Sequence, residues 1–196
     1  LMRGAVLQLH RWGVLDEIRS AGTPEIRSTT FHYGDEVITI PIKERDGLDA
    51  LYAPRRMILD AALADAACQA GAEIVHGRAL TGLVTSDRGR VIGARISGGD
   101  GATAVVRADL VIGADGINSR VARILNAPVT HSAPHATASI YAYWKDLDLE
   151  GNHWYYEIGA AVGAIPTNGD ETCVFASIPR SRFEAERRGG LRSLYG

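Results

Sequence analysis

The fold of this chain is decided by the stretch Val106-Arg107-Ala108-Asp109-Leu110-Val111-Ile112-Gly113-Ala114-Asp115-Gly116-Ile117-Asn118-Ser119-Arg120. Its centre is apolar at three consecutive positions, Leu110 to Ile112, which is typical of a strand buried on both faces of a sheet. The small pair Gly113-Ala114 lets a backbone or a ligand approach closely before the chain turns at Asp115-Gly116. We therefore predict a strand over 105–114, a sharp turn at Gly116 and a helix over 119–125.

The carboxylate of Asp115 has two interpretations that this stretch alone leaves open. Open α/β sheets bind ligands at the carboxyl ends of their strands, so Asp115 would contact a cofactor there. Ser119 would cap the next helix, whose amides would attract a phosphate together with Arg120 or Arg123. Alternatively, Asp115 and Ser119 are ordinary turn and cap residues and bind no ligand.

The spacing of apolar residues and glycines predicts helices and strands in interleaved blocks. Two short helices are expected between Met2 and Ser20, and a longer helix over 55–70 after Pro54. A hairpin is expected over 29–42 around Gly34-Asp35. Further strands are expected at 72–75, 79–85, 91–96 and in the β-rich region 137–178, followed by a charged helix start at 180.

These blocks divide the chain into two predicted units. The helical and α/β segments, 1–28 and 53–128, form one unit, and the antiparallel β-rich segments, 29–52 and 129–196, form the other. The chain therefore crosses between the units more than once. The predicted fold class is α/β, with a three-layer sheet unit interleaved with an antiparallel β-rich unit.

Composition excludes several classes of function. The 196 residues carry a formal net charge of −2, which argues against nucleic acid as a partner. Every hydrophobic run is interrupted well before the ~18 apolar residues that a membrane span needs. Two cysteines, Cys68 and Cys173, are too few for a disulfide framework, so we interpret both as buried thiols in a reducing, cytoplasmic compartment.

No motif for nucleophilic or metal catalysis is found. The sequence lacks Gly-x-Ser-x-Gly, His-Glu-x-x-His and the phosphate loop Gly-x-x-x-x-Gly-Lys, and its six histidines lack a metal-binding spacing. A formal Gly-x-Gly-x-x-Ala occurs at Gly99, Gly101 and Ala104, but a strand is expected to follow it. A dinucleotide loop needs a helix there, so we interpret these glycines as a hairpin turn.

Two arginines at the start of the long helix point to an acidic neighbour. Arg55 and Arg56 lie in the first turn, where the helix dipole disfavours a cation unless an anion is close. We therefore expect an anionic group to dock at this helix start.

Two motifs carry a family resemblance. The pattern Arg56-x-x-Leu59-x-x-x-Leu63-x-x-Ala66, followed some fifty residues later by 109–116 and Ser119, resembles the FAD-dependent aromatic hydroxylases of the para-hydroxybenzoate hydroxylase type. The opening Arg3-Gly4-Ala5-Val6-Leu7 looks like the helix that follows the first flavin-binding strands of that family. The Gly-x-Gly-x-x-Gly strand and the later Gly-Asp motif of the family have no counterpart here. The resemblance thus implies the middle of a longer enzyme, which alone would bind FAD weakly or not at all.

The resemblance implies that the unit formed by 1–28 and 53–128 is part of an FAD-binding unit, and that the unit formed by 29–52 and 129–196 is part of a substrate-binding one. It also implies roles for particular residues. It implies a cofactor-binding set consisting of Arg56, Asp115, Gly116, Arg3, Ser119 and Arg120, without a catalytic protein nucleophile or a metal. The family usually has an arginine three residues after the motif's serine, but Ala122 stands there, with Arg120 and Arg123 nearby. The aromatic residues of the β-rich unit, Tyr141, Tyr143, Trp154 and Tyr156, are candidates for the substrate wall. For any single one of them, an ordinary place in a sheet is the alternative.

The activity that the resemblance implies is FAD-dependent, NAD(P)H-using monooxygenation of an aromatic or polyketide-like small molecule, with molecular oxygen as co-substrate. Two alternatives stay open. One is an FAD-dependent reductase or oxidase of the same fold, such as the isoprenoid reductase type. The second alternative is a non-catalytic fragment or binding module. A halogenase of this fold would be expected to carry Trp-x-Trp-x-x-Pro, which is not found. The sequence predicts no oligomeric state.

Overall fold

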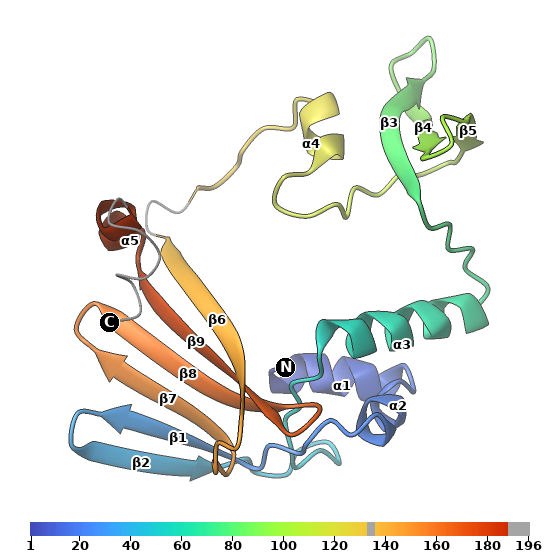
Figure 1. The fold of residues 1–196 in the computed structure, drawn as a ribbon. Coiled ribbons are helices and arrows are strands. Elements are labelled where there is room, and N and C mark those ends of the chain that lie inside the picture. The colour runs from blue at the N-terminus through green and yellow to red at the C-terminus, as the bar shows by residue number, and fades with distance from the viewer. Residues whose placement is uncertain (133–135, 188–196) are drawn as a thin grey trace. The chain divides into compact units, whose positions relative to one another are not determined.

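The computed structural model describes residues 1–132 and 136–187, and the chain divides into two compact units (Figure 1). Unit 1 comprises residues 1–72 and 133–196, and unit 2 comprises residues 73–132. Helices from the segments 1–28 and 53–70 therefore share a unit with the β-rich segments. The assignment of FAD binding to 1–28 and 53–128, and of substrate binding to 29–52 and 129–196, stays a prediction.

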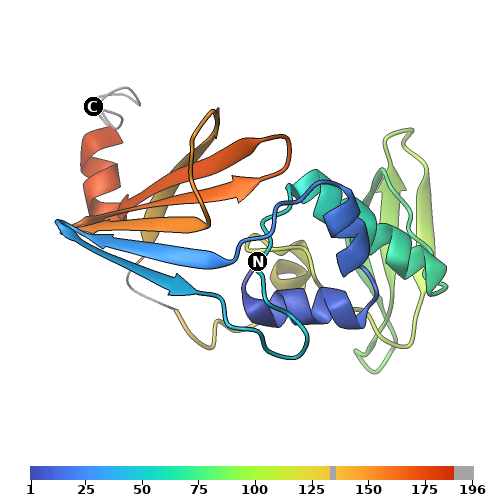
Figure 2. The ribbon, with the colours of Figure 1, turned by 90° about the horizontal axis from the view of Figure 1, so that it is seen from below.

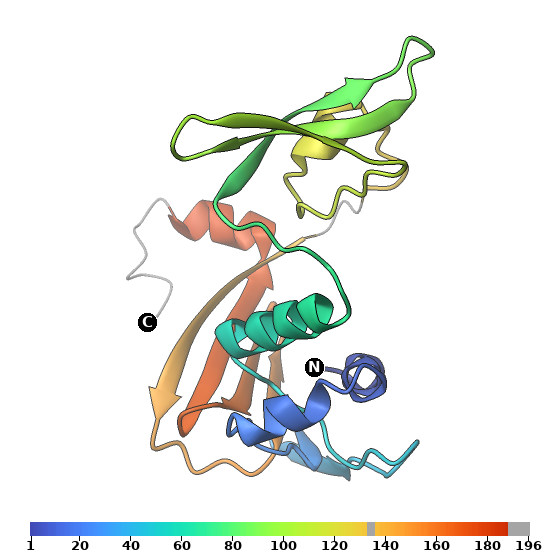
Figure 3. The same cartoon turned by 90° about the vertical axis from the view of Figure 1, so that its right-hand side faces the viewer.

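Three helices of unit 1 form where the sequence predicts them. They are α1 (Arg3–Arg11), α2 (Leu15–Ser20) and α3 (Arg56–Gln69). Gly13 and Gly22, with φ of 71° and 74°, follow α1 and α2 in the left-handed conformation that glycine adopts without strain. Figures 1 and 3 show the three helices grouped at one end of a sheet.

The hydrophobic core of the described residues lies among these helices and the segment that precedes α3. Val6, Leu15 and Ile18 are at most 1% exposed and pack with Ile26 and Tyr52. Ile165, from the sheet, packs against the same cluster. The core thus fixes the start of α3 against one face of the sheet, which is where the sequence places Arg55 and Arg56.

The sheet of unit 1 has six strands in the order β2-β1-β7-β8-β9-β6. Their bounds are β1 (Ser28–Tyr33), β2 (Glu36–Pro41), β6 (Thr137–Lys145), β7 (Asn152–Glu157), β8 (Ala160–Thr167) and β9 (Glu171–Pro179). Neighbours are antiparallel except β1 and β7, which are parallel and attach the β1–β2 hairpin to the later strands (Figure 2). A short helix, α5 (Arg180–Glu186), follows β9 at the predicted helix start.

Unit 2 contains a three-stranded antiparallel meander, β3 (Arg78–Thr85), β4 (Val91–Gly98) and β5 (Thr103–Arg107), and the short helix α4 (Arg120–Ile124). Residues 98–101 form the turn between β4 and β5, which pair directly. The hairpin interpretation of Gly99 and Gly101 is therefore confirmed. Together, the mixed sheet, the antiparallel sheet and the helices confirm the predicted combination of α and β structure.

Two predicted strands are wrong. Residues 72–75 form no strand, and the strand predicted over 105–114 ends at Arg107 and pairs only with β4. Leu110 and Ile112 are 74% and 78% exposed, although the sequence predicts them buried. A strand that is apolar on both faces is stable only between neighbouring strands and covering helices, and no strand of the described residues pairs with 109–114.

One cysteine also departs from expectation. Cys68 is exposed on α3, not buried, whereas Cys173 on β9 is half-buried, and both are free thiols. Burial raises the pKa of the Cys173 thiol. Across residues 1–132 and 136–187, no helix has the length and apolar character that crossing a membrane requires.

Candidate functional site

Asp115 is fixed by three hydrogen bonds from its own turn and helix. The Ser119 hydroxyl donates to Oδ1 at 2.5 Å, and the amides of Arg120 and Val121 donate to Oδ2 at 2.6 and 3.2 Å. Ser119 Oγ in turn accepts from the amide of Ala122 at 3.0 Å. These bonds are made in the predicted sharp turn, where Gly116 has φ of +80°.

This capping arrangement changes what the helix can offer a ligand. The amides of Arg120, Val121 and Ala122 donate to the side chains of Asp115 and Ser119. They are therefore not open to a phosphate, contrary to one interpretation of the sequence. The Ser119 hydroxyl, followed by the Val121 and Arg120 amides, holds the pKa of Asp115 below its usual range. Asp115 is therefore an exposed, oriented carboxylate that is charged at neutral pH.

Gly113 and the two nearby arginines complete this part of unit 2. A Cβ on Gly113 would lie 2.8 Å from the Val121 side chain, so the predicted close approach is made by α4 itself. Arg123 folds back on the carbonyls of Ser119 and Asn118, at 3.3 and 3.0 Å, whereas Arg120 lies exposed at the helix start. Ser119, Arg123 and Val129 line an open hollow of about 550 Å³ beside α4.

The two arginines at the start of α3 both have carboxylate partners within the chain. Arg56 is exposed and pairs with Asp60 one turn later, at 2.8 Å between Nη2 and Oδ2. Arg55 is half-buried and pairs with Glu171 of β9 at 3.2 Å. The anion that the helix dipole demands is therefore supplied by the protein, although the exposed Arg56 guanidinium remains accessible to a further anion.

Arg3, the remaining predicted cofactor residue, makes structural contacts. Its guanidinium donates to the carbonyl oxygens of Leu48 at 2.9 Å and Lys43 at 2.5 Å, which ties α1 to the loop after β2. These bonds use Nη1 and Nη2, nitrogens through which an arginine commonly forms bidentate hydrogen bonds with a phosphate. The geometry therefore gives Arg3 a positioning role toward the loop 43–48.

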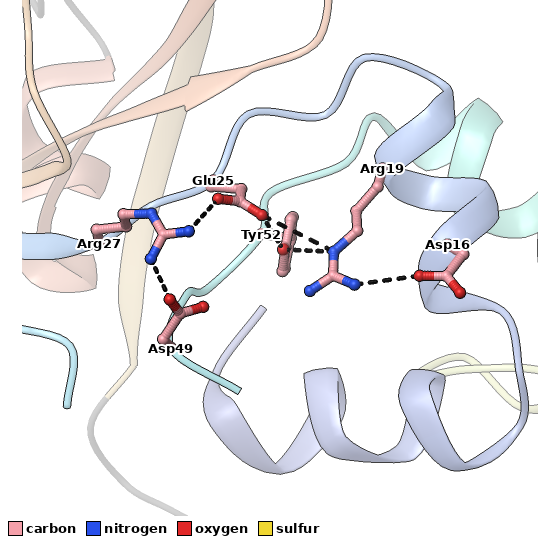
Figure 4. Close-up of polar contacts among 6 residues, drawn as sticks. All are labelled: Asp16, Arg19, Glu25, Arg27, Asp49 and Tyr52. Atoms are coloured by element: carbon pink, nitrogen blue, oxygen red, sulfur yellow. Dashed lines mark hydrogen bonds and ion pairs between the residues drawn. The ribbon is translucent and has the colours of Figure 1, made fainter. Parts of the chain in front are cut away.

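A polar network around the buried Tyr52 positions the segment that leads into α3. Figure 4 shows Tyr52 between Arg19 and Glu25: the Arg19 Nε–H donates to the phenol oxygen at 2.8 Å, and the phenol donates to Glu25 Oε1 at 2.9 Å. Tyr52 is fully buried, and burial raises the pKa of its phenol. The network is extended by Arg27, which pairs with Glu25 and Asp49.

The four predicted substrate residues lie on one face of the six-stranded sheet. Two of them, Trp154 and Tyr141, lie in one row across the strands. In this row Trp154 pairs with Gly163, Gly163 with Phe175, and Phe175 with Tyr141. Tyr143 and Tyr156 lie two residues from this row and share its face. We call this surface the aromatic face, and it comprises Phe31, Tyr33, Tyr141, Tyr143, Trp154, Tyr156 and Phe175.

The rings of the aromatic face form two groups in contact: Phe31, Tyr33, Tyr156, Trp154 and Phe175 make one, and Tyr141 and Tyr143 make the other. Tyr33 stacks on Tyr156 at 5.3 Å between centroids, and Trp154 meets Phe175 edge-on at 5.4 Å. Gly163 lies between the latter two, and a Cβ there would come within 2.4 Å of the Phe175 ring. Tyr141 is 63% exposed and Tyr143 42%, so the surface is open to a planar ligand.

Three aromatic residues and one arginine of this region are not among the residues predicted from the sequence. Phe31, Tyr33 and Phe175 follow from the alternation of their strands, but only once the pairing of β1 with β7 and of β8 with β9 is known. Arg55 was grouped with Arg56, yet its guanidinium lies 3.3 Å from the centroid of the Tyr143 ring. Within residues 1–132 and 136–187, no group of three or more His, Cys, Asp or Glu side chains is placed to hold a metal.

Comparison with known proteins gives a family and a fold. The model of a family described as FAD binding domain matches residues 4–188. A digeranylgeranylglycerophospholipid reductase from Methanosarcina acetivorans is 43% identical over 120 residues, which are 61% of this chain and 26% of that protein.

Solved structures of similar fold include flavin-dependent enzymes. The myxobacterial chondrochloren halogenase CndH, an FAD-dependent enzyme, matches all of this chain and 47% of its own, with 19% identity and a TM-score of 0.80. The flavin-dependent halogenase CmlS matches all of this chain and 37% of its own, with 22% identity and a TM-score of 0.82. PqsL of Pseudomonas aeruginosa, a probable FAD-dependent monooxygenase, matches 92% of this chain and 50% of its own, with 20% identity and a TM-score of 0.71. This chain thus spans half or less of each of these three.

Proposed function

Because the chain belongs to the FAD binding domain family, we propose that it is part of an FAD-dependent oxidoreductase and supplies both a cofactor contact and the substrate wall. The observation that carries the proposal is the gathering of Tyr141, Tyr143, Trp154 and Tyr156 on one open sheet face. The finer proposal is monooxygenation of an aromatic or polyketide-like small molecule, with NAD(P)H as reductant and molecular oxygen as co-substrate.

The residues present fit FAD in part. A guanidinium recognises a phosphate, and Arg56 and Arg120 are both exposed. A carboxylate accepts hydrogen bonds from hydroxyl groups, and Asp115 is held in its charged form. Arg3 and the amides of α4 are already bonded within the chain, so we assign them no direct contact with the cofactor.

When bound, FAD supplies the redox chemistry, and the protein supplies binding, orientation and exclusion of water. The aromatic face serves to orient the substrate, because its rings offer a stacking surface to a planar ligand. Asp115, fixed by Ser119 and the helix amides, keeps a hydrogen-bond acceptor in one place without the need to reorganise. No nucleophile of the protein takes part in this account.

A reductase of the same fold is the second candidate, supported by the 43% identity to the Methanosarcina reductase over 120 residues. The two reactions differ in what they require. A monooxygenase consumes oxygen and places one of its atoms in the product, whereas a reductase works under nitrogen and adds hydrogen to a double bond.

Isotope labelling separates the two candidates. The protein produced from its own gene is given FAD, NAD(P)H and a panel of phenols, polyketides and isoprenoids, under ¹⁸O₂ or under nitrogen. The proposal predicts an ¹⁸O-labelled product from an aromatic substrate and none without oxygen. A product formed equally well under nitrogen contradicts monooxygenation and favours the reductase. The proposed cytoplasmic location is tested separately, by fractionation of cells that express the gene.

A further inference from the structure

Arg55 stands at the boundary between the start of α3 and the aromatic face. Its Cζ lies 3.3 Å from the ring centroid of Tyr143, and its Nη2 pairs with Glu171 at 3.2 Å, with only 27% and 23% of the two side chains exposed. Its backbone amide donates to Asn168 Oδ1 at 3.0 Å. Arg55 is thus attached to the sheet through both its side chain and its backbone.

The residue that receives the Arg55 amide is itself fixed. The side-chain amide of Asn168 donates to the carbonyl of Ala21 at 3.0 Å and to Thr23 Oγ1 at 2.9 Å. The hydroxyl of the preceding Thr167 donates to the carbonyl of Ala53 at 2.6 Å. The turn after β8 therefore holds the backbone on both sides of Pro54, and it leaves Arg55 little freedom to move away from Tyr143.

This placement carries a cost in stability that the ion pair with Glu171 does not remove. Arg55 Nη1 is buried without a hydrogen-bond partner. Costly local arrangements that the surrounding structure holds in place are expected at functional positions. Arg55 is also adjacent to Arg56, the proposed FAD contact, and it stacks on Tyr143, a proposed substrate contact.

We propose that Arg55 is a positioning residue for the substrate wall: it fixes the Tyr143 ring as the rigid end of the aromatic face. Tyr143 is held from two sides, by Arg55 and by Tyr141, whose ring meets it edge-on at 5.9 Å between centroids. A fixed ring offers a planar ligand a stacking surface that loses no conformational freedom on binding. The inference rests on the proposed function only in naming the ligand, a planar aromatic molecule.

The first experiment measures the ring itself, without any ligand. The protein is labelled with 3-fluorotyrosine, and its Tyr143 signal is assigned by its loss in Tyr143→Phe. A clamped ring flips slowly and gives two ¹⁹F resonances, so two are expected in the parent protein and one averaged resonance in Arg55→Met. Glu171→Gln, which keeps the shape of the partner but removes its charge, is expected to speed the flip as well. One averaged resonance in the parent protein would contradict the fixing of the Tyr143 ring by Arg55, which we call the clamp.

The second experiment measures binding of 2-naphthol to the FAD-supplemented protein, by quenching of the naphthol fluorescence. Arg55→Met and Tyr143→Leu are each expected to weaken binding about 3- to 30-fold, the range of a cation–π contact. Arg180→Met, which removes another ion-paired arginine of unit 1, is the matched control and is expected to change nothing. Because Arg55 acts through Tyr143, Arg55→Met is expected to cause no further loss in the Tyr143→Leu background.

The outcomes separate the clamp from the proposed function. Two ¹⁹F resonances with no naphthol binding to the parent protein contradict the substrate wall and leave the clamp standing. Equal naphthol affinity in the parent protein and in Arg55→Met contradicts the positioning role and leaves the wall standing. Additive losses in the double variant contradict action through Tyr143. Any Arg55→Met protein that fails to fold is replaced by Glu171→Gln, for which the same results are decisive.

Discussion

Asp115 and Ser119 hydrogen-bond to each other, with the Ser119 hydroxyl donating to Asp115 Oδ1 at 2.5 Å. Each side chain also accepts amides from the first turn of α4. The cap interpretation of these residues is therefore realised in the structure. The capped carboxylate is exposed and keeps lone pairs for a further donor, so capping is compatible with the proposed contact to FAD.

Removing the cap hydroxyl is expected to loosen α4. Ser119→Ala leaves the Ala122 amide without its acceptor and Asp115 without its shortest donor, at a cost of about 1 kcal/mol. Hydrogen exchange at the amides of 120–122 measures the effect. Ser20→Ala, at an exposed position of unit 1, is the control and is expected to leave these amides unchanged. Undiminished protection in Ser119→Ala contradicts the cap.

The amides of residues 120 and 121 are expected to lose their hydrogen bonds to Asp115 in acid. The folded-state pKa of Asp115 is depressed, first of all by the Ser119 hydroxyl, so its contribution is complete above the ordinary carboxyl pKa of about 3.9. The contribution is lost as pH falls through the lower folded value, because a protonated Asp115 accepts the amides weakly. Chemical shifts of residues 120 and 121 between pH 5 and pH 2 report it. An Asp115→Asn protein that shows the same acid transition excludes Asp115 as its source.

Tyr52→Phe is expected to destabilise unit 1 by about 1–3 kcal/mol, because it removes the hydroxyl that joins Arg19 to Glu25. Urea unfolding measures the change in the free energy of unfolding. Tyr33→Phe, at a tyrosine that is 48% exposed, is the matched control and should stay within about 0.5 kcal/mol of the parent protein. Equal changes in the free energy of unfolding for the two substitutions would contradict the structural role of the Tyr52 network.

Gly163→Ala is expected to disturb the aromatic face. The added methyl would lie 2.4 Å from the Phe175 ring, so the ring or the strand must shift, at about 1–3 kcal/mol. Unfolding experiments give the energy, and near-ultraviolet circular dichroism reports the change around Trp154. Gly99→Ala, at a turn of unit 2 with open space around it, is the comparison. If Gly163→Ala changes neither the free energy of unfolding nor the near-ultraviolet spectrum, then Trp154 and Phe175 are not packed across Gly163.

The local structure of this chain could be predicted from its sequence, because the signals are local. Gly13 separates α1 from α2, Gly34-Asp35 turns the first hairpin, and the glycines at 98–101 turn the meander. Pairing between distant segments could not be predicted in this way. β1 lies beside β7, more than a hundred residues later, and no local pattern records that register.

The same distinction explains the errors. The segment 109–114 has the composition of a doubly covered strand, but composition does not provide the neighbours that such a strand needs. Arg55 and Arg56 are identical and adjacent, yet one stacks on Tyr143 and the other pairs with Asp60 on the helix surface. Which arginine turns toward the sheet is decided by the packing around Asn168 and Glu171, residues more than a hundred positions away.

The account's central claim, that this chain contributes to an FAD site, is tested most directly by a flavin titration of the protein produced from its own gene. Flavin fluorescence is followed as FAD is added to the parent protein, to Arg56→Ala and to Arg11→Ala, a control at another exposed arginine. Saturable binding of FAD is expected, about tenfold weaker in Arg56→Ala because one charge-assisted phosphate contact is lost, and unchanged in Arg11→Ala. Absence of saturable binding in the parent protein would contradict the claim.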